Sequence, residues 1–276
     1  MPVAVRTPEQ NALALNSLPP MPAVALKVIQ VAQDPKSAAS DLASVVVTDP
    51  GLSVAILRVV NSAAHRRLVE ITSVKEALVL LGLVQARNVA ITGAIACAYA
   101  PKTATVHFSL EAFWRHSLGV AFRASELAAG RERIDPATAF TAGVLHNMAR
   151  LAIFYSDSDG LDRATFQAIR CGITLEEAER EVLGYDHCLL GGQLAERWGL
   201  PATIRDAIAG HHDATRAGPL ASLLASADRY CTEHGLLPGY TLAAVEAGAV
   251  DPGWEKLLYQ VDILTGMILK RQIRAA

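Results

Sequence analysis

The sequence predicts an all-α fold, and two features of its pattern carry that prediction. Apolar residues recur at spacings of three and four in segment after segment, as on the buried face of a helix, whereas sustained alternation of apolar and polar residues is hard to find. Alanine, the strongest helix former, is abundant throughout. The chain has 276 residues, of which 51 % are hydrophobic, so it can fill a sizeable core. We therefore expect one large or two modest helical domains.

The N-terminal part of the chain is expected to contain about five helices before residue 105. The first has an apolar stripe over residues 21–32. Asp49 directly precedes a proline and is the predicted N-cap of a later helix. Ser73 and Glu76 have the spacing of a capping box ahead of another helix, whose predicted end is Gly82.

Residues 101–107 begin with a proline and lack a clear period, which predicts a boundary between two helical subdomains. Beyond this boundary the periodicity predicts helices over residues 109–129, 135–155, 174–183, 187–198, 201–212, 219–231 and 254–271. We expect residues 234–253, with four glycines and two prolines, to form a loop.

The charge balance argues against nucleic acid as a partner. The 25 Lys and Arg are offset by 27 Asp and Glu, which leaves a net charge of −2. Sequence-independent binding to a phosphate backbone needs a broad positive field, and this composition does not supply one.

The cysteines and the apolar segments predict a cytoplasmic protein without a membrane span. The four cysteines form no C-x-x-C pair, which argues against a disulfide framework and against a thiolate zinc site, and favours a reducing compartment. The most apolar stretch, residues 89–100, is far shorter than the about 20 residues that cross a bilayer. The N-terminus has no apolar core segment typical of a signal peptide.

Polar side chains fall on helix faces that the pattern assigns to the core. Five of the eight histidines do so, namely His116, His146, His187, His211 and His212. Asp228 joins them, because it shares spacings of three and four with Leu224 and Cys231. A buried carboxylate needs a cation, a metal or several hydrogen-bond donors.

We therefore expect the five histidines and Asp228 to converge on one polar site. Imidazole and carboxylate ligands suit a divalent metal such as iron, manganese or zinc. The alternative, for each histidine taken singly, is a core residue with its hydrogen bonds satisfied.

Several sequence motifs of the N-terminal half closely resemble the HDOD domain of bacterial signalling proteins. They are LPPMPA at residues 18–23, DPGL at 49–52, LRVVNS at 57–62, and Glu76-Ala77 followed by LGL at 81–83. The resemblance covers about residues 15–212. It implies an N-terminal helical bundle, residues 15–105, packed on a subdomain built like the HD phosphohydrolases, residues 106–212. Residues 213–276 would form a helical extension, matched only at Asp228.

The resemblance also implies roles for the inward-facing polar residues. In catalytic HD proteins, the HD-GYP phosphodiesterases above all, histidines and aspartates hold metals that activate water against a phosphate ester. The positions that match this set are His116, His146, His187, His211, His212 and Asp228. One position departs from it, because Asn147 stands where the acid of the His-Asp pair is found. An amide carries no charge and cannot bridge two cations as a carboxylate does. No Gly-Tyr-Pro loop follows the paired histidines either.

The expected function is therefore a non-catalytic module of bacterial signal transduction that binds signalling proteins or a small ligand such as a cyclic dinucleotide. One alternative is a metal-dependent phosphohydrolase or cyclic-dinucleotide phosphodiesterase that tolerates Asn147. Another is a nucleotide sensor without hydrolysis. Its phosphate contacts would come from Lys102, Arg115, Arg123 and Arg150, although isolated arginines on helices are usually solvated surface.

Overall fold

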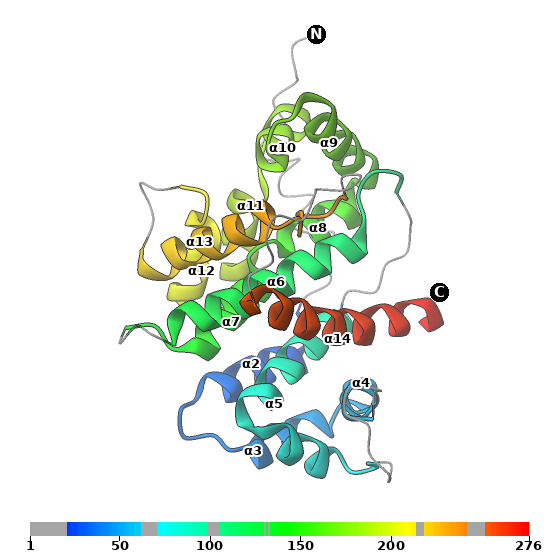
Figure 1. Cartoon of the computed structure of the whole chain (residues 1–276), viewed down its shortest axis with the longest axis vertical. Coiled ribbons are helices and arrows are strands. Elements are labelled where there is room, and N and C mark those ends of the chain that lie inside the picture. The colour runs from blue at the N-terminus through cyan, green and yellow to red at the C-terminus, as the bar shows by residue number, and fades with distance from the viewer. Residues whose placement is uncertain are drawn as a thin grey trace. The chain divides into compact units, whose positions relative to one another are not determined.

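The computed structural model describes residues 21–61, 71–98, 105–129, 131, 133–213, 218–241 and 252–275. All the regular structure in these ranges is helical (Figure 1), which confirms the all-α prediction. The chain divides into a larger compact unit, Pro101–Leu257, and a smaller one made of Pro20–Ala100 and Leu258–Ala276. Residues 213–276, expected as an extension, are therefore shared between the two units.

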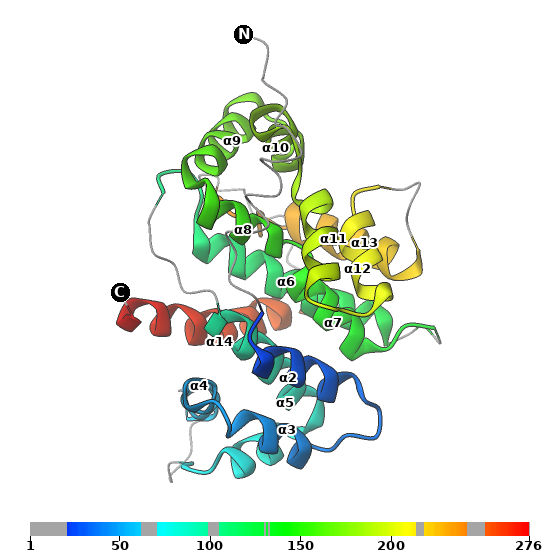
Figure 2. The same ribbon diagram turned by 180° about the vertical axis from the view of Figure 1, so that it is seen from behind.

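The smaller unit contains α2 (Ala23–Gln33), α3 (Ala39–Val46), α4 (Pro50–Val60) and α5 (Val74–Ala98). Helices α2 and α3 both pack against α5 (Figure 2). The predicted cap at Asp49 is present, because its side chain accepts a hydrogen bond from the Leu52 N–H at 2.9 Å. Gly82 interrupts α5 with φ +74°, so the predicted helix end there is a sharp bend between two helical segments.

Asn61, within one of the resemblance motifs, has a structural role. Its side-chain amide donates to the Ile71 carbonyl at 2.7 Å and its oxygen accepts from the Ile71 N–H at 2.9 Å. The side chain thus replaces a backbone partner and fixes the chain ahead of α5.

One described helix, Val74–Cys97, is long and apolar enough to cross a membrane by length and composition alone, with a mean hydropathy of 1.6. The apolar stretch predicted from the sequence, residues 89–100, was too short, because the helix continues through the bend at Gly82 and joins two apolar segments. Within the fold 56 % of the apolar stretch is buried, as is usual for the core helix of a soluble protein, so the helix is weak evidence for a membrane span.

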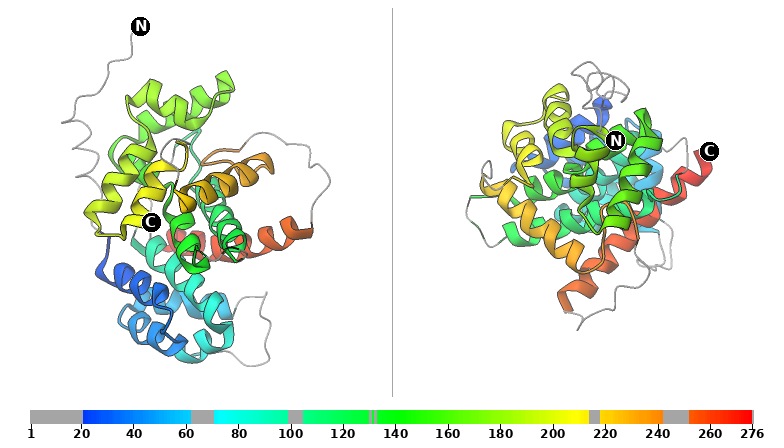
Figure 3. Two further views of the ribbon diagram at one scale, coloured as in Figure 1. Left: turned by 90° about the vertical axis from the view of Figure 1, so that its left-hand side faces the viewer. Right: turned by 90° about the horizontal axis from the view of Figure 1, so that it is seen from above.

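The larger unit is built from a continuous series of helices. They are α6 (Leu110–Ala128), α7 (Pro136–Leu145), α8 (Met148–Ser156), α9 (Ser158–Cys171), α10 (Leu175–Leu183), α11 (His187–Arg197), α12 (Ala202–Gly210) and α13 (Pro219–Glu233). Helix α6 packs against α7 and α13, and α12 packs against α11 and α13 (Figure 3). Helices α9 and α10 pair with each other at one end of the unit. Helix α14 (Pro252–Ala275) begins in the larger unit and continues in the smaller one.

The predicted helix over residues 135–155 is wrong in one respect, since it breaks at His146 and Asn147 into α7 and α8. The His146 ring bonds the Gly143 carbonyl at 2.6 Å, which in a continuous helix would accept the Asn147 N–H. Gly143 itself allows a close approach of α7 to α6, because a Cβ there would lie 2.4 Å from the Ala121 Cα. The break therefore places the His-Asn pair at a corner that is packed tightly against α6.

Helix α9 was not predicted. Its buried residues are Gly160, Leu161, Ala164, Thr165 and Ala168, small or polar apart from one leucine. Such a face produces little apolar signal, although Asp157 does cap the helix through the Gly160 N–H. Of the predicted loop 234–253, residues 242–251 lie outside the described residues.

Candidate functional site

The structure brings all six predicted site residues together inside the larger unit. Neighbouring rings lie close, with centroid separations of 5.4 Å for His116 and His146, 5.1 Å for His146 and His211, 5.2 Å for His187 and His211, and 4.2 Å for His211 and His212. Four of the imidazoles are at most 1 % exposed, and Asp228 is 8 % exposed. His212 was expected to face the core, but its side chain is 27 % exposed at the edge of a pocket, so that expectation is wrong.

Hydrogen-bond acceptors that bind the Nδ1–H groups orient the buried rings. Three of them donate to backbone carbonyls: His116 to Leu236 at 2.7 Å, His146 to Gly143 at 2.6 Å and His211 to Ile208 at 2.7 Å. A carbonyl oxygen can only accept, so each Nδ1 carries a proton, and a ring of this kind that is neutral has its lone pair on Nε2. This is how histidine ligands of metals are usually held.

The fourth ring, His187, is held by a buried carboxylate that sequence reasoning missed. The Glu179 Oε2 accepts the His187 backbone N–H at 3.0 Å and its Nδ1–H at 2.6 Å. The Glu179 Oε1 accepts the Arg150 Nε–H at 2.6 Å, and both partners of this ion pair are at most 2 % exposed. The sequence did contain one indication that Glu179 is buried, because it lies four residues after Leu175 and four before Leu183, which are both buried. Arg150 is therefore buried rather than solvated surface.

Burial keeps three of the rings, those of His146, His187 and His211, uncharged. Burial lowers the pKa of His211 to about 3. It also lowers the pKa of His146 well below the usual value, with the neighbouring His211 as a further cause. The pKa of His187 is lowered in the same way, with the Arg150 guanidinium as a further cause. Burial would raise the pKa of Asp228, but the His116 contact outweighs it and holds that pKa well below its usual range. Near neutral pH the imidazoles of His146, His187 and His211 are thus neutral, and the Asp228 carboxylate is ionised.

The ligand atoms fall into two groups with the spacing of metal sites. The first group contains His187, Cys188, His211 and His212, and the second contains His116, His146 and Asp228. Within each group the atoms lie within 4.8 Å of one another. Cys188 adds a thiol that the cysteine spacing did not predict, and its burial raises the pKa of that thiol.

One contact indicates that a metal fits the first group. The Nε2 atoms of His187 and His211 lie 3.3 Å apart, and both carry lone pairs. Two nitrogens bound at 2.0–2.1 Å to tetrahedral zinc would be about 3.3 Å apart. A cation between these nitrogens would relieve their repulsion, so the residues present suit the metal that the fold implies. In the second group the His146 Nε2 is buried without a hydrogen-bond partner in the described chain.

Asn147 directly follows His146, at the position where the family resemblance implies an acid. Its side chain is 1 % exposed, and its Oδ1 has no hydrogen-bond partner among the described residues. Asp228 contacts both groups, with its Oδ1 3.0 Å from the His116 Nε2 and its Oδ2 3.5 Å from the His212 Nε2.

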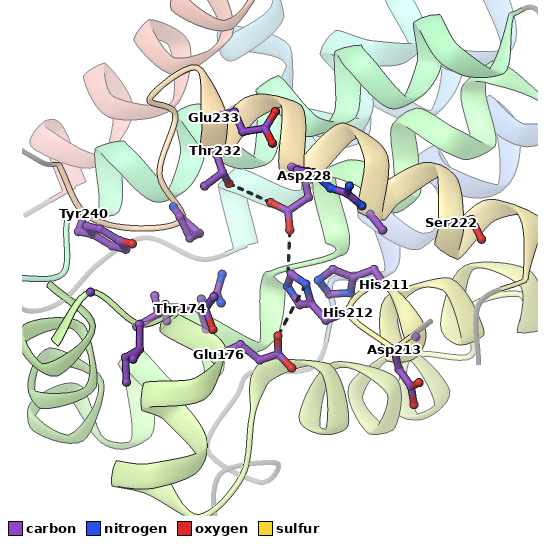
Figure 4. Close-up of a pocket in the computed structure, with 18 residues that line it drawn as sticks. Thr174, Glu176, His211, His212, Asp213, Ser222, Asp228, Thr232, Glu233 and Tyr240 are labelled. Carbon is purple, nitrogen blue, oxygen red and sulfur yellow. Dashed lines mark hydrogen bonds and ion pairs between the residues drawn. The ribbon is translucent and has the colours of Figure 1, made fainter. Parts of the chain in front are cut away.

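A pocket of about 700 Å³ reaches the site from solvent. Figure 4 shows Asp228 on one side of the His212 ring and Glu176 on the other, with Tyr240 and Ser222 at opposite ends of the pocket. Arg150 also lines it, and its Nη1 is buried without a hydrogen-bond partner in the described chain. Of the other expected phosphate contacts, Arg115 and Arg123 do not line this pocket and Lys102 lies outside the described residues.

Comparison with known proteins agrees with the motifs and the geometry. The family model of the HDOD domain matches residues 18–214. The chain belongs to the HDOD family.

Solved structures share the helical arrangement. An HDOD domain protein with unknown function from Geobacter sulfurreducens is 26 % identical with a TM-score of 0.70, covering 97 % of this chain and 94 % of that one. A protein from Shewanella amazonensis SB2B, provisionally named a phosphohydrolase, is 25 % identical with a TM-score of 0.65. The match covers 96 % of this chain and 93 % of that one. A protein from Marinobacter aquaeolei VT8, provisionally named a signal transduction protein, is 24 % identical with a TM-score of 0.74, covering 97 % and 62 %, and supports the fold alone.

A curated relative from Treponema pallidum (strain Nichols), described as an uncharacterized protein, is 22 % identical over 223 residues. The match covers 78 % of this chain but spans 42 % of the relative's length.

Proposed function

We propose that this chain is a non-catalytic HDOD module of cytoplasmic signal transduction, which acts by binding a partner protein or a small ligand. The observation that carries the proposal is Asn147, buried beside His146 with an amide where the HD pair has an acid. The provisional name of the Shewanella protein points to the enzymatic alternative.

The chemistry of phosphate-ester hydrolysis explains why Asn147 matters. A pair of metals lowers the pKa of a bound water and neutralises the charge that develops on phosphate, and acidic ligands hold the two cations together. An amide oxygen offers a weaker, neutral donor. Asp228 alone would have to bridge the two groups, and it already contacts both His116 and His212.

A metal retained at the site would act on stability rather than on chemistry. The histidines of both groups and Asp228 would hold it, with iron, manganese and zinc as the expected ions. Bound metal stabilises the native state by mass action. Elemental analysis of protein purified without an affinity tag measures its content, and His146→Ala should lower the melting temperature of the loaded protein.

The enzymatic alternative is tested by turnover. The purified chain is incubated with Mn²⁺ or Fe²⁺ and a cyclic dinucleotide, and His146→Ala is compared with His234→Ala, which changes an exposed histidine. We expect no hydrolysis. Metal-dependent turnover that survives in His234→Ala and disappears in His146→Ala would overturn the proposal.

The same ligand distinguishes a nucleotide sensor from a module that binds proteins. Calorimetric titration with cyclic dinucleotides, together with thermal shift, measures binding without turnover. Binding that is lost in Arg150→Met protein that is still folded would support a sensor, because Arg150 lines the pocket and its Nη1 has no hydrogen-bond partner among the described residues. Absence of heat and of a thermal shift would support protein partners.

A further inference from the structure

An exposed group of apolar side chains surrounds the bend of α5 in the smaller unit. Among the described residues, four of the eleven exposed large hydrophobic side chains fall within residues 79–84, and they are between 37 % and 65 % exposed. They are Val79, Leu80, Leu83 and Val84, and we call them the α5 patch. A Cβ at Gly82 would have no heavy atom within 4 Å, so the bend itself faces open space. Contiguous exposed apolar residues of this kind mark a contact with a partner.

The patch is distinct from the face of α5 that packs in the core. Ala77, Leu78 and Ala86 are fully buried, and α5 packs against α2, α3 and α4. A helix that is apolar on all sides is usually covered on all sides. The core therefore explains the buried residues of α5 but not the exposed ones.

The order of the residues about the bend is nearly palindromic. Residues with some exposure stand in pairs at equal distances along the chain from the midpoint between Leu81 and Gly82. The pairs are Leu80 and Leu83, Val79 and Val84, and Glu76 and Arg87. The two inner pairs have identical side chains, and the outer pair has opposite charges. A two-fold axis through the midpoint would place leucine on leucine, valine on valine and carboxylate on guanidinium in two copies of the chain.

The two charges at the ends of the patch are available for such a contact. Neither the Glu76 carboxylate nor the Arg87 guanidinium has an ion-pair partner in the part of the chain that the structure describes. The Arg87 Nη2 donates to the carbonyls of Asp34 at 3.0 Å and Ser37 at 3.3 Å. These carbonyls orient the guanidinium without neutralising it. The opposite charges favour antiparallel pairing of the two α5 helices, because parallel pairing would bring like charges together.

We propose that the α5 patch joins two copies of this chain in a weak, closed homodimer with antiparallel α5 helices. Both copies use the same surface, so the dimer does not extend into larger polymers. The patch is small beside the about 800 Å² that each partner buries in a standard interface, so monomer and dimer should exchange. The inference goes beyond the proposed function and does not depend on the histidine site, which belongs to the larger unit. Two joined modules would bind a partner with two matching sites more tightly than one module does.

Sedimentation velocity of the purified chain over a range of concentrations measures this association. We expect an equilibrium between monomer and dimer that shifts with concentration, without larger species. Val84→Glu places an unpaired charge inside the contact and should raise the dissociation constant by at least about 10-fold. The matched control is Val106→Glu, which makes the same change at an exposed valine of the larger unit and should leave the dissociation constant unchanged.

Glu76→Arg tests the antiparallel pairing and leaves the apolar residues in place. It sets two arginines opposite each other, so the dimer should weaken, and added salt should restore part of it by screening their repulsion. A wild-type chain that stays monomeric would overturn the proposal and leave the patch to a different protein. A dimer that persists unchanged in Val84→Glu, or association beyond the dimer, would overturn it as well. If Val84→Glu does not fold by circular dichroism, Glu76→Arg decides, because an unchanged dimer in that variant contradicts the pairing.

Discussion

Glu179→Ala should be one of the most destabilising single substitutions in the larger unit. The substitution leaves the Arg150 guanidinium buried without its partner, because the pair is 2.6 Å apart and at most 2 % exposed. It also removes the acceptor of the His187 Nδ1 and backbone N–H. Breaking a buried ion pair by removing one partner costs about 3–5 kcal/mol. We expect a loss of that size in the free energy of unfolding.

Urea denaturation followed by tryptophan fluorescence measures this loss in the right part of the chain. All three tryptophans, Trp114, Trp198 and Trp254, belong to the larger unit, so the signal reports its unfolding. The matched control is Glu181→Ala on the same helix, whose side chain is exposed and which should change stability by no more than about 0.5 kcal/mol.

A double variant distinguishes a buried ion pair from a mere packing defect. Replacing both Arg150 and Glu179 by leucine removes the unpaired charge, so this variant should be more stable than Glu179→Ala by at least about 1 kcal/mol. A loss below about 1 kcal/mol in Glu179→Ala at an unchanged denaturant slope would refute the reasoning. So would a double variant that is less stable than the single one.

Three other perturbations test the packing, the protonation and the charge of the site. Gly143→Ala should cost about 1–3 kcal/mol by urea denaturation, because the new Cβ would lie 2.4 Å from backbone of Ala121; a neutral result would show that α6 and α7 separate easily. Lowering the pH from about 7.5 to about 5.5 should destabilise the metal-free protein by up to about 1.4 kcal/mol per pH unit for each of His146, His187 and His211. The folded-state pKa of His211, about 3, lies below that of the unfolded chain, so stability that is present above about pH 6.5 is lost as the pH falls. If the free energy of unfolding of His211→Gln depended on pH as steeply as that of the wild type, His211 would not be the origin of the effect. Asn147→Asp should lower the melting temperature of the metal-free protein, because it buries a charge, and added Mn²⁺ should raise it again. An unchanged melting temperature without metal would contradict the burial of that charge.

Helices and their caps could be predicted because they depend on short-range patterns. Asp49, Asp135 and Thr174 each accept the hydrogen bond of a residue three positions later; Asp49 was the predicted cap, and the other two are the first residues of the helices predicted over 135–155 and 174–183. Convergence of the histidines was also predictable, since inward-facing polar groups of packed helices have to share one interior.

The parts that could not be predicted depend on contacts between distant segments. Glu179 and Arg150 meet across α10 and α8, and Cys188 approaches His211 only because α11 packs on α12. Periodicity assigns each of these residues to a face but not to a partner. The break at His146 is similar, because one side-chain hydrogen bond to Gly143 decides it.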